Sequence, residues 1–206
     1  MRWGVHWRIG RDSLHGRKSL IFQLGTILPD WFERHPIHRR KESLSPVVKR
    51  IVRLRDMQPG WKMDWYLGTV AHYLCDYCCM AHNEEYYRFY RHRVYEVESQ
   101  KYYKHVRERK KPQYVAAQVR YMQQMKQMYP ALFDGSLQAG EFSAELIGLI
   151  NTTVSELHRR IRALGCEKWW TDLRVAELDV RYSYRLIYTV LCILDGHDAE
   201  GETKND

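Results

Sequence analysis

The residues of this chain best suited to chemistry are histidines and carboxylates that recur at fixed spacing between positions 72 and 96. Asp76 follows His72 by four residues. Glu96 follows His92 by the same interval, and His82 lies between the two pairs. On an α-helix, side chains at i and i+4 lie on one face, one turn apart, so each pair can reach a single metal ion. Because imidazole and carboxylate groups are typical zinc ligands, the pattern predicts a divalent metal site.

Each pair also has an ordinary structural interpretation, because histidine and acid pairs at this spacing arise easily by chance on helices. Two pairs that flank a third histidine in an apolar stretch favour the metal. Buried imidazole and carboxylate groups carry a desolvation cost that a cation would offset. On a continuous helix, His72, Asp76 and His82 would span an arc of roughly 120°. This arc suits neighbouring metal ions better than one ion.

The elements that must position these residues have the pattern of helices. Apolar residues recur at helical spacing, with Ser45-Pro46 as a start signal and Pro29 and Pro59-Gly60 as stop signals. The helices predicted in this way cover residues 13–28, 46–57, 64–82, 84–108, 112–128, 143–164 and 172–194. No convincing strand pattern is present. We therefore expect an all-α, single-domain bundle of about six to eight helices over residues 1–195, followed by a polar, disordered tail at 196–206.

Composition narrows the class of protein further. The 206 residues are 45% hydrophobic and 28% charged, which is typical of a globular protein, and the net charge of +8 favours anionic partners. No apolar run is long enough for a transmembrane segment, and no signal peptide is recognisable, so a cytoplasmic location is expected. Cys75, Cys78 and Cys79 lack the second Cys-x-x-Cys of a zinc ribbon. Cys79 packs in the core, lines the metal cavity or binds the metal, and packing is the ordinary interpretation.

Taken in order, these residues resemble the zinc-dependent phospholipase C family, relatives of the single-strand-specific zinc nucleases. The central His-x₃-Asp-x₅-His motif of that family is similar to His72, Asp76 and His82 in its Tyr-Leu-Gly and His-Tyr-Leu-x-Asp context. The later His-x-x-x-Glu matches His92 and Glu96. The segment 22–30 also looks like the Phe-x-x-Gly-x-x-x-Pro-Asp of small family members. The resemblance covers about residues 1 to 98 and implies a helical bundle around two or three zinc ions.

The resemblance also implies a ligand set, carried over by position. The implied metal ligands are His6, Asp30, His38, His72, Asp76, His82, His92 and Glu96. One zinc ion would take the ligands at positions 30, 38, 72 and 76, and a second those at 82, 92 and 96. Family members hold a third ion with an N-terminal tryptophan that removal of a signal peptide exposes, and this sequence departs from the family there because no signal peptide is recognisable ahead of Trp3. His6 would complete that site with Asp76 as the bridge. His15 remains an alternative to His6, and His35 to His38.

The implied activity is zinc-dependent hydrolysis of phosphodiester bonds, similar to that of phospholipase C, with Asp30 as both ligand and proton acceptor. The substrate would be a phosphate ester, either a lipid headgroup or a nucleotide. Trp31 could line the substrate mouth, and the Tyr86–Lys111 stretch could touch an anionic membrane surface, although packing and a solvated helix face are the ordinary interpretations. The alternatives are a nuclease or nucleotidase with the same metal cluster, and a non-catalytic basic helical module with structural metal.

Overall fold

The computed structural model describes residues 3–13, 19–32, 40–82 and 89–195. Over these ranges the chain is helical and contains no strand, which confirms the all-α prediction. Six helices are long, and three have only four to six residues. The α-helices are α1 (Trp3–Ser13), α2 (Leu20–Gly25), α3 (Pro29–Phe32), α4 (Arg40–Arg55), α5 (Trp61–Cys78), α6 (Phe89–Met128), α7 (Pro130–Asp134), α8 (Ala139–Ala163) and α9 (Leu173–Asp195). Two short 3₁₀ turns, η1 (Met80–His82) and η2 (Trp169–Thr171), connect them.

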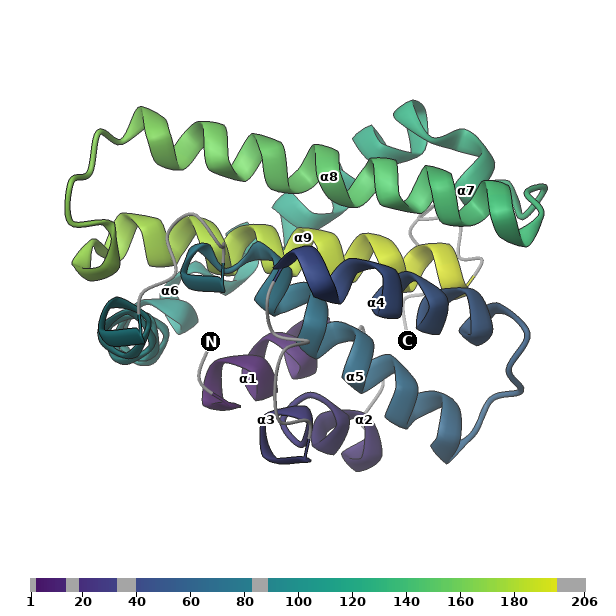
Figure 1. The fold of residues 1–206 in the computed structure, drawn as a ribbon, viewed down its shortest axis with the longest axis horizontal. Helices are drawn as coiled ribbons and strands as arrows, with labels where there is room; N and C mark the ends of the chain where they lie inside the picture. Colours follow the sequence, from purple (N-terminus) through teal and green to yellow (C-terminus); the bar gives the residue numbers. More distant parts are fainter. Residues whose placement is uncertain (1–2, 14–18, 33–39, 83–88, 196–206) are drawn as a thin grey trace.

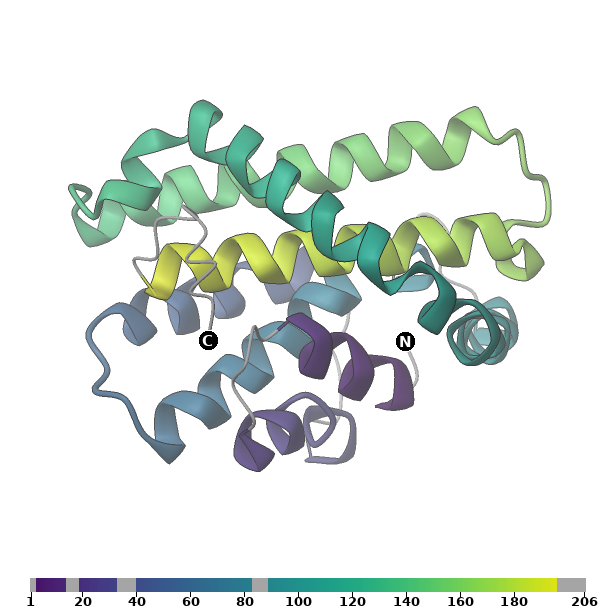
Figure 2. The ribbon, with the colours of Figure 1, turned by 180° about the vertical axis from the view of Figure 1, so that it is seen from behind.

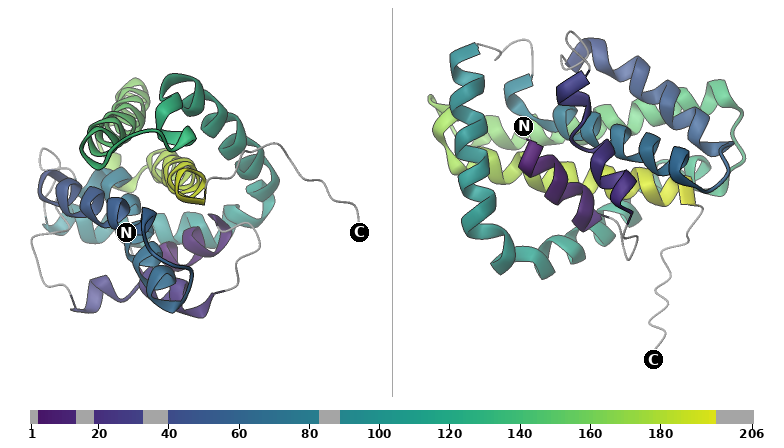
Figure 3. Two further views of the ribbon diagram at one scale, coloured as in Figure 1. Left: turned by 90° about the vertical axis from the view of Figure 1, so that its right-hand side faces the viewer. Right: turned by 90° about the horizontal axis from the view of Figure 1, so that it is seen from below.

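Helix α9 lies at the centre of the bundle. In Figure 1 it runs between α8 on one side and α4 and α5 on the other. Figure 2 views the molecule from the opposite side and shows α6 crossing in front of α9. The end-on view in Figure 3 shows the other helices grouped around it. Fourteen of its 23 residues are buried, in agreement with a helix that is covered on more than one side. Helices α1, α4 and α5, from the first half of the chain, therefore pack against the last described helix of the sequence.

Helix α5 is the second buried helix and carries the central motif. Every residue from Leu67 to Cys78 is buried, so this part of the helix is covered on all faces. His72 and Asp76 consequently lie in the interior rather than at the surface. A charged or polar side chain in such a place must be compensated by partners. The fold thus places the predicted ligands where an unneutralised carboxylate would be costly.

A contact between two glycines brings α2 against α5. A Cβ atom at Gly68 would lie 2.2 Å from the carbonyl oxygen of Phe22 and 2.8 Å from Cα of Gly25. Only a residue without a side chain fits at this crossing. The close approach also brings the turn after α2 next to His72, one helical turn beyond Gly68.

Gly68→Ala is expected to destabilise the protein by about 2 to 3 kcal/mol, because its Cβ would meet backbone atoms that cannot turn aside. Chemical denaturation of the two proteins measures the difference. Gly140→Ala is the matched control, since a Cβ there meets nothing within 4 Å and alanine favours the helix. Equal stability of Gly68→Ala and the parent protein would contradict the close packing of α2 on α5.

The predicted start of a helix at Ser45-Pro46 is wrong, because α4 begins at Arg40 and contains Pro46. In the described part of the predicted helix 13–28, α2 covers only Leu20–Gly25, and Pro29 begins α3.

Three further differences bear on how the site is positioned. Helix α1 was not predicted, because Gly4 and Gly10 are poor helix formers. Gly10 is required by packing instead, since a Cβ there would lie 2.6 Å from Cγ2 of Thr26. The helices predicted at 84–108 and 112–128 form the single helix α6, which continues through Pro112. Figure 3 shows α6 changing direction in its middle, as a proline that kinks a helix without ending it would produce.

The third difference concerns the predicted helix 64–82, which is interrupted. Helix α5 ends at Cys78, and Cys79 has an extended backbone with φ −69° and ψ 120°. The chain then forms η1, which carries His82. The angles expected from one continuous helix therefore do not apply to Cys79 and His82.

Candidate metal centre

The carboxylate of Asp76 lies at the centre of a cluster of histidines. Its Oδ1 is 3.2 Å from Nε2 of His6 and 3.5 Å from Nε2 of His82, and its Oδ2 is 3.4 Å from Nε2 of His72. All four side chains are buried or nearly so. They come from α1, α5 and η1, so the cluster joins three elements. Ligand atoms of His6, His72 and Asp76 all lie within 4.8 Å of one another.

The orientation of His72 is set by a backbone carbonyl. Its Nδ1 lies 3.0 Å from the carbonyl oxygen of Thr26, in the turn that follows α2. Because that oxygen can only accept, Nδ1 carries the proton and donates it. The lone pair of the ring is then on Nε2, which faces Asp76. The ring of His6 stacks on that of His72 with the centroids 4.2 Å apart, which fixes both imidazoles.

Asp30 joins the cluster from the short helix α3. Its Oδ1 is 3.6 Å from Nε2 of His72. Unlike the other members, its side chain retains 30% of its exposure to solvent. The cluster is therefore closed on the side of α5 and open at Asp30.

A second group of ligands lies beside the first. Nε2 of His92 is 3.2 Å from Nε2 of His82 and 3.8 Å from Oε1 of Glu96. The rings of His82 and His92 meet edge to face. The interruption of the helix at Cys79 explains this geometry, because η1 turns His82 so that it contacts both Asp76 and His92. The two groups thus meet at His82 and Asp76.

The surroundings of His6, His92 and Asp76 shift their pKa values in the directions that favour metal binding. Burial and the neighbouring His72 lower the pKa of His6, and burial lowers the pKa of His92 against the opposing effect of Glu96. Burial acts to raise the pKa of Asp76, but electrostatic attraction to the neighbouring imidazoles of His82, His6 and His72 outweighs burial, and the pKa lies well below its ordinary value. Neutral imidazole and ionised carboxylate are the forms that coordinate a cation.

The donor set fits zinc. Imidazole nitrogens and carboxylate oxygens converge on one buried region, and at least one ring presents its lone pair there, which agrees with the ligand preferences of Zn²⁺. Cys79 is buried, and burial raises the pKa of its thiol. It therefore remains protonated, unlike a thiolate ligand.

Several sequence predictions fall outside what the structure describes. His15, His35 and His38 lie outside the described residues, as does the tail 196–206 predicted to be disordered. The backbone of Trp31 belongs to α3, but its side chain is outside the description. His6 contacts Asp76, in agreement with its predicted place in the cluster. The preferences for His6 over His15 and for His38 over His35 stay predictions.

Asp179 of α9 is a further residue of this region that sequence reasoning missed. Its side chain is fully buried, and its Oδ2 accepts a hydrogen bond of 2.7 Å from the backbone N–H of Met80. The same oxygen accepts a hydrogen bond from the hydroxyl of Tyr95. Met80 begins the turn that carries His82, and Tyr95 precedes Glu96. One carboxyl group on α9 therefore ties together the two segments that carry the second ligand group.

The stability of an Asp179→Asn variant should differ from the parent in a pH-dependent way. Burial raises the pKa of Asp179 from 3.8 to about 7, against the opposing hydrogen bonds from Tyr95 and Met80. The folded state thus holds the proton of Asp179 more tightly than the unfolded state does. Protonation of Asp179 therefore stabilises the folded protein fully below pH ~4, and this contribution is lost as the pH rises to ~7. Asparagine does not ionise. The unfolding free energy of the variant, relative to that of the parent, should therefore rise by about 1.4 kcal/mol per pH unit over that window.

Unfolding free energies measured between pH 4 and 7 test this expectation. Ser183→Ala is the control, because Ser183 donates to the backbone oxygen of Asp179 and does not titrate in this range. A constant difference between Asp179→Asn and the parent across the window would show that Asp179 does not titrate there.

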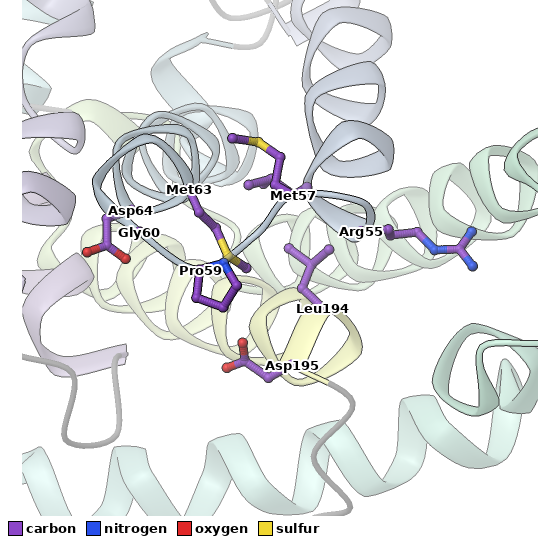
Figure 4. Close-up of a pocket in the computed structure, with 9 residues that line it drawn as sticks. Arg55, Met57, Pro59, Gly60, Met63, Asp64, Leu194 and Asp195 are labelled. Atoms are coloured by element: carbon purple, nitrogen blue, oxygen red, sulfur yellow. The ribbon is translucent and has the colours of Figure 1, made fainter.

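A separate cavity of about 450 Å³ lies away from the cluster, where the end of α4, the start of α5 and the end of α9 meet (Figure 4). Met57, Met63 and Leu194 supply its apolar wall. Oδ2 of Asp64 accepts a 2.6 Å hydrogen bond from Ser19, and Arg55 points away and donates to the carbonyl oxygen of Leu137. These two charged groups are engaged in holding elements together, and the lining contains none of the candidate ligands.

Comparison with known proteins agrees with the geometry. A family model described as zinc dependent phospholipase C matches residues 7–145, which is 139 of the 206 residues. The match begins one residue after His6 and ends before α9. No curated protein and no solved structure shows significant similarity to the chain. Among the described helices, none combines the length and apolar character needed to cross a membrane.

Proposed function

Because this chain belongs to the zinc-dependent phospholipase C family, we propose that it hydrolyses phosphodiester bonds at the centre formed around Asp76. The observation that carries the proposal is the approach of three histidine ring nitrogens to one buried carboxylate within 3.2–3.5 Å. Such a group of basic and acidic side chains in the interior is costly without a cation to share.

The two groups of residues would hold two or three zinc ions. His72, Asp76 and Asp30 would contribute to one ion, with His38 as the ligand expected from sequence, and His82, His92 and Glu96 to a second. His6 lies against Asp76 and would serve a third ion that shares this carboxylate. When bound, zinc supplies Lewis-acid stabilisation of phosphate oxygens and lowers the pKa of water.

Asp30 is the proposed proton acceptor. Among the described residues of the first group, Asp30 has the side chain that keeps contact with solvent, and its Oδ1 lies 3.6 Å from Nε2 of His72. A proton taken up there can pass to bulk water. The ring of His72 is fixed through Thr26 with its lone pair on Nε2, so His72 and Asp30 would meet through the zinc ion that they share.

The exposed edge at Asp30 also bears on the alternative of a purely structural metal. A structural zinc site is closed by four protein ligands, whereas a catalytic site retains an open position. The partial exposure of Asp30 supports the catalytic alternative. A phosphate ester is the proposed substrate class, with a phospholipid preferred over a nucleotide on the basis of the family.

Metal analysis followed by a hydrolysis assay tests the proposal. Purified protein should contain at least two zinc ions per chain and should cleave phosphatidylcholine or bis(p-nitrophenyl) phosphate in a chelator-sensitive manner. A nuclease would instead prefer single-stranded DNA, and a nucleotidase would release phosphate from nucleotides. Bound zinc with no hydrolysis of any of these substrates would favour a structural metal and contradict the proposal.

A further inference from the structure

The start of α6 presents two adjacent aromatic side chains to solvent. Phe89 retains 70% of its exposure and Tyr90 retains 74%. Large aromatic side chains usually pack against other residues, because their apolar surface is costly to leave in water. Phe89 and Tyr90 precede His92 by three and two residues, so this surface adjoins the metal centre.

Arginines accompany these aromatic residues. The guanidinium of exposed Arg93 lies 5.9 Å from the ring centroid of Phe89, one turn earlier on α6. The guanidinium of Arg91 lies 4.2 Å from the ring centroid of Trp170 in η2. Neither arginine forms an ion pair with a carboxylate in the described parts of the chain. Arg93 is exposed, so its positive charge faces solvent, where an anionic partner can reach it.

The surface is connected to the core through a chain of rings. Trp170 meets Trp169 edge to face at 5.9 Å, and Trp169 lies 5.5 Å from Tyr95. Tyr95 in turn donates to Asp179. Figure 3 shows the first half of α6 along one edge of the molecule. The aromatic and basic side chains at the start of α6 are thus linked by ring contacts to the buried interior. We call this surface the α6 edge, and it consists of Phe89, Tyr90, Arg91, Arg93 and Trp170.

We propose that the α6 edge binds the surface of an anionic phospholipid bilayer and brings the metal centre to its substrate there. The proposal rests on the proposed function for the identity of the substrate. Tyrosine and tryptophan favour the level of the lipid headgroups, because one part of each side chain is apolar and the other is polar. The apolar ring of phenylalanine inserts at the boundary between the headgroups and the acyl chains. Arginine forms strong, often bidentate hydrogen bonds with phosphate groups. The net charge of +8 adds attraction to the same partner.

Co-sedimentation with vesicles tests the proposal. The double variant Phe89→Ala/Tyr90→Ala should lose about tenfold or more in affinity for mixed phosphatidylcholine and phosphatidylglycerol vesicles. Arg93→Gln should lose about fivefold, with a smaller effect on vesicles of phosphatidylcholine alone. Turnover of soluble bis(p-nitrophenyl) phosphate should not change in either variant, because neither alters a proposed ligand.

Two matched controls separate this edge from general exposure and charge. Trp61 is 66% exposed and has Lys62 near its ring, so Trp61→Ala removes a comparable aromatic from the start of α5. Arg120→Gln removes an exposed arginine near the other end of α6. Both controls should retain vesicle binding.

The proposal is overturned by unchanged vesicle binding in the double variant, or by an equal loss in Trp61→Ala. It is also overturned if the double variant loses affinity for a single-stranded oligonucleotide and keeps its affinity for vesicles, since the edge would then serve a nucleic acid. Failure of the proposed function has a different signature. In that case no phosphodiester is hydrolysed, while the variants still differ in vesicle binding as expected.

Discussion

Asp76→Asn is expected to lower zinc content and to reduce phosphodiester turnover by at least about 100-fold. The asparagine side chain keeps the shape of aspartate but lacks the negative charge that faces His6, His72 and His82 within 3.2–3.5 Å. Because this carboxylate contacts both groups of ligands, one substitution disturbs both. Zinc per chain, measured on protein purified without added metal, and initial rates on a soluble phosphodiester report the two effects.

Cys79→Ala is the control for Asp76→Asn. Cys79 is buried close to the same region, and its protonated thiol is not expected to bind metal. This variant should keep nearly full zinc content and activity. Full zinc occupancy in Asp76→Asn would contradict the bridging role of Asp76, even if the activity were lost.

Removal of the metal should lower the melting temperature by roughly 8 to 16 °C. A ligand present at a thousand times its dissociation constant stabilises the folded state by about 4 kcal/mol, and each kcal/mol shifts the melting temperature of a chain of this size by about 2 to 4 °C. The physical reason is the buried carboxylate and imidazole cluster, which loses its compensating charge when zinc is withdrawn. Thermal unfolding with and without a chelator measures the shift.

Asp76→Asn also provides the control for this experiment. With the charge of the central carboxylate removed, the variant should respond less to chelator and to added zinc. An identical melting temperature for the metal-free protein before and after zinc addition would contradict a buried metal centre in the native fold.

Much of the centre could be predicted from the sequence, because its spacing has a direct geometric meaning. Two of the contacts, His72 with Asp76 and His92 with Glu96, join residues one turn apart on single helices. Such contacts require only that the helix forms. The all-α class followed from the same helical periodicity, and the family resemblance is confirmed over a longer range than its motifs indicated.

The remaining geometry depends on contacts between distant segments, which periodicity does not reveal. The interruption at Cys79 lies in an apolar stretch with no glycine or proline to mark it, and it is accompanied by the hydrogen bond from Met80 to Asp179, about a hundred positions later in the chain. The signal that could have indicated Asp179 is its place among apolar residues of α9, where an acidic side chain needs a partner. Packing also overrides the local signal of Gly10 in α1. Pro112 does not end α6, although proline predicted a boundary between two helices there.

The position of α9 at the centre of the bundle has a consequence for how the protein is made. The proposed ligands all lie within the first 96 residues, whereas Asp179 lies in the last described helix. During synthesis the ligands leave the ribosome well before the helix that fixes Met80 and Tyr95. A nascent chain therefore carries the histidines and carboxylates before their final arrangement exists. The final arrangement of the proposed ligands must wait for α9, so a chain cut short before α9 would possess these ligands without the helix that aligns them.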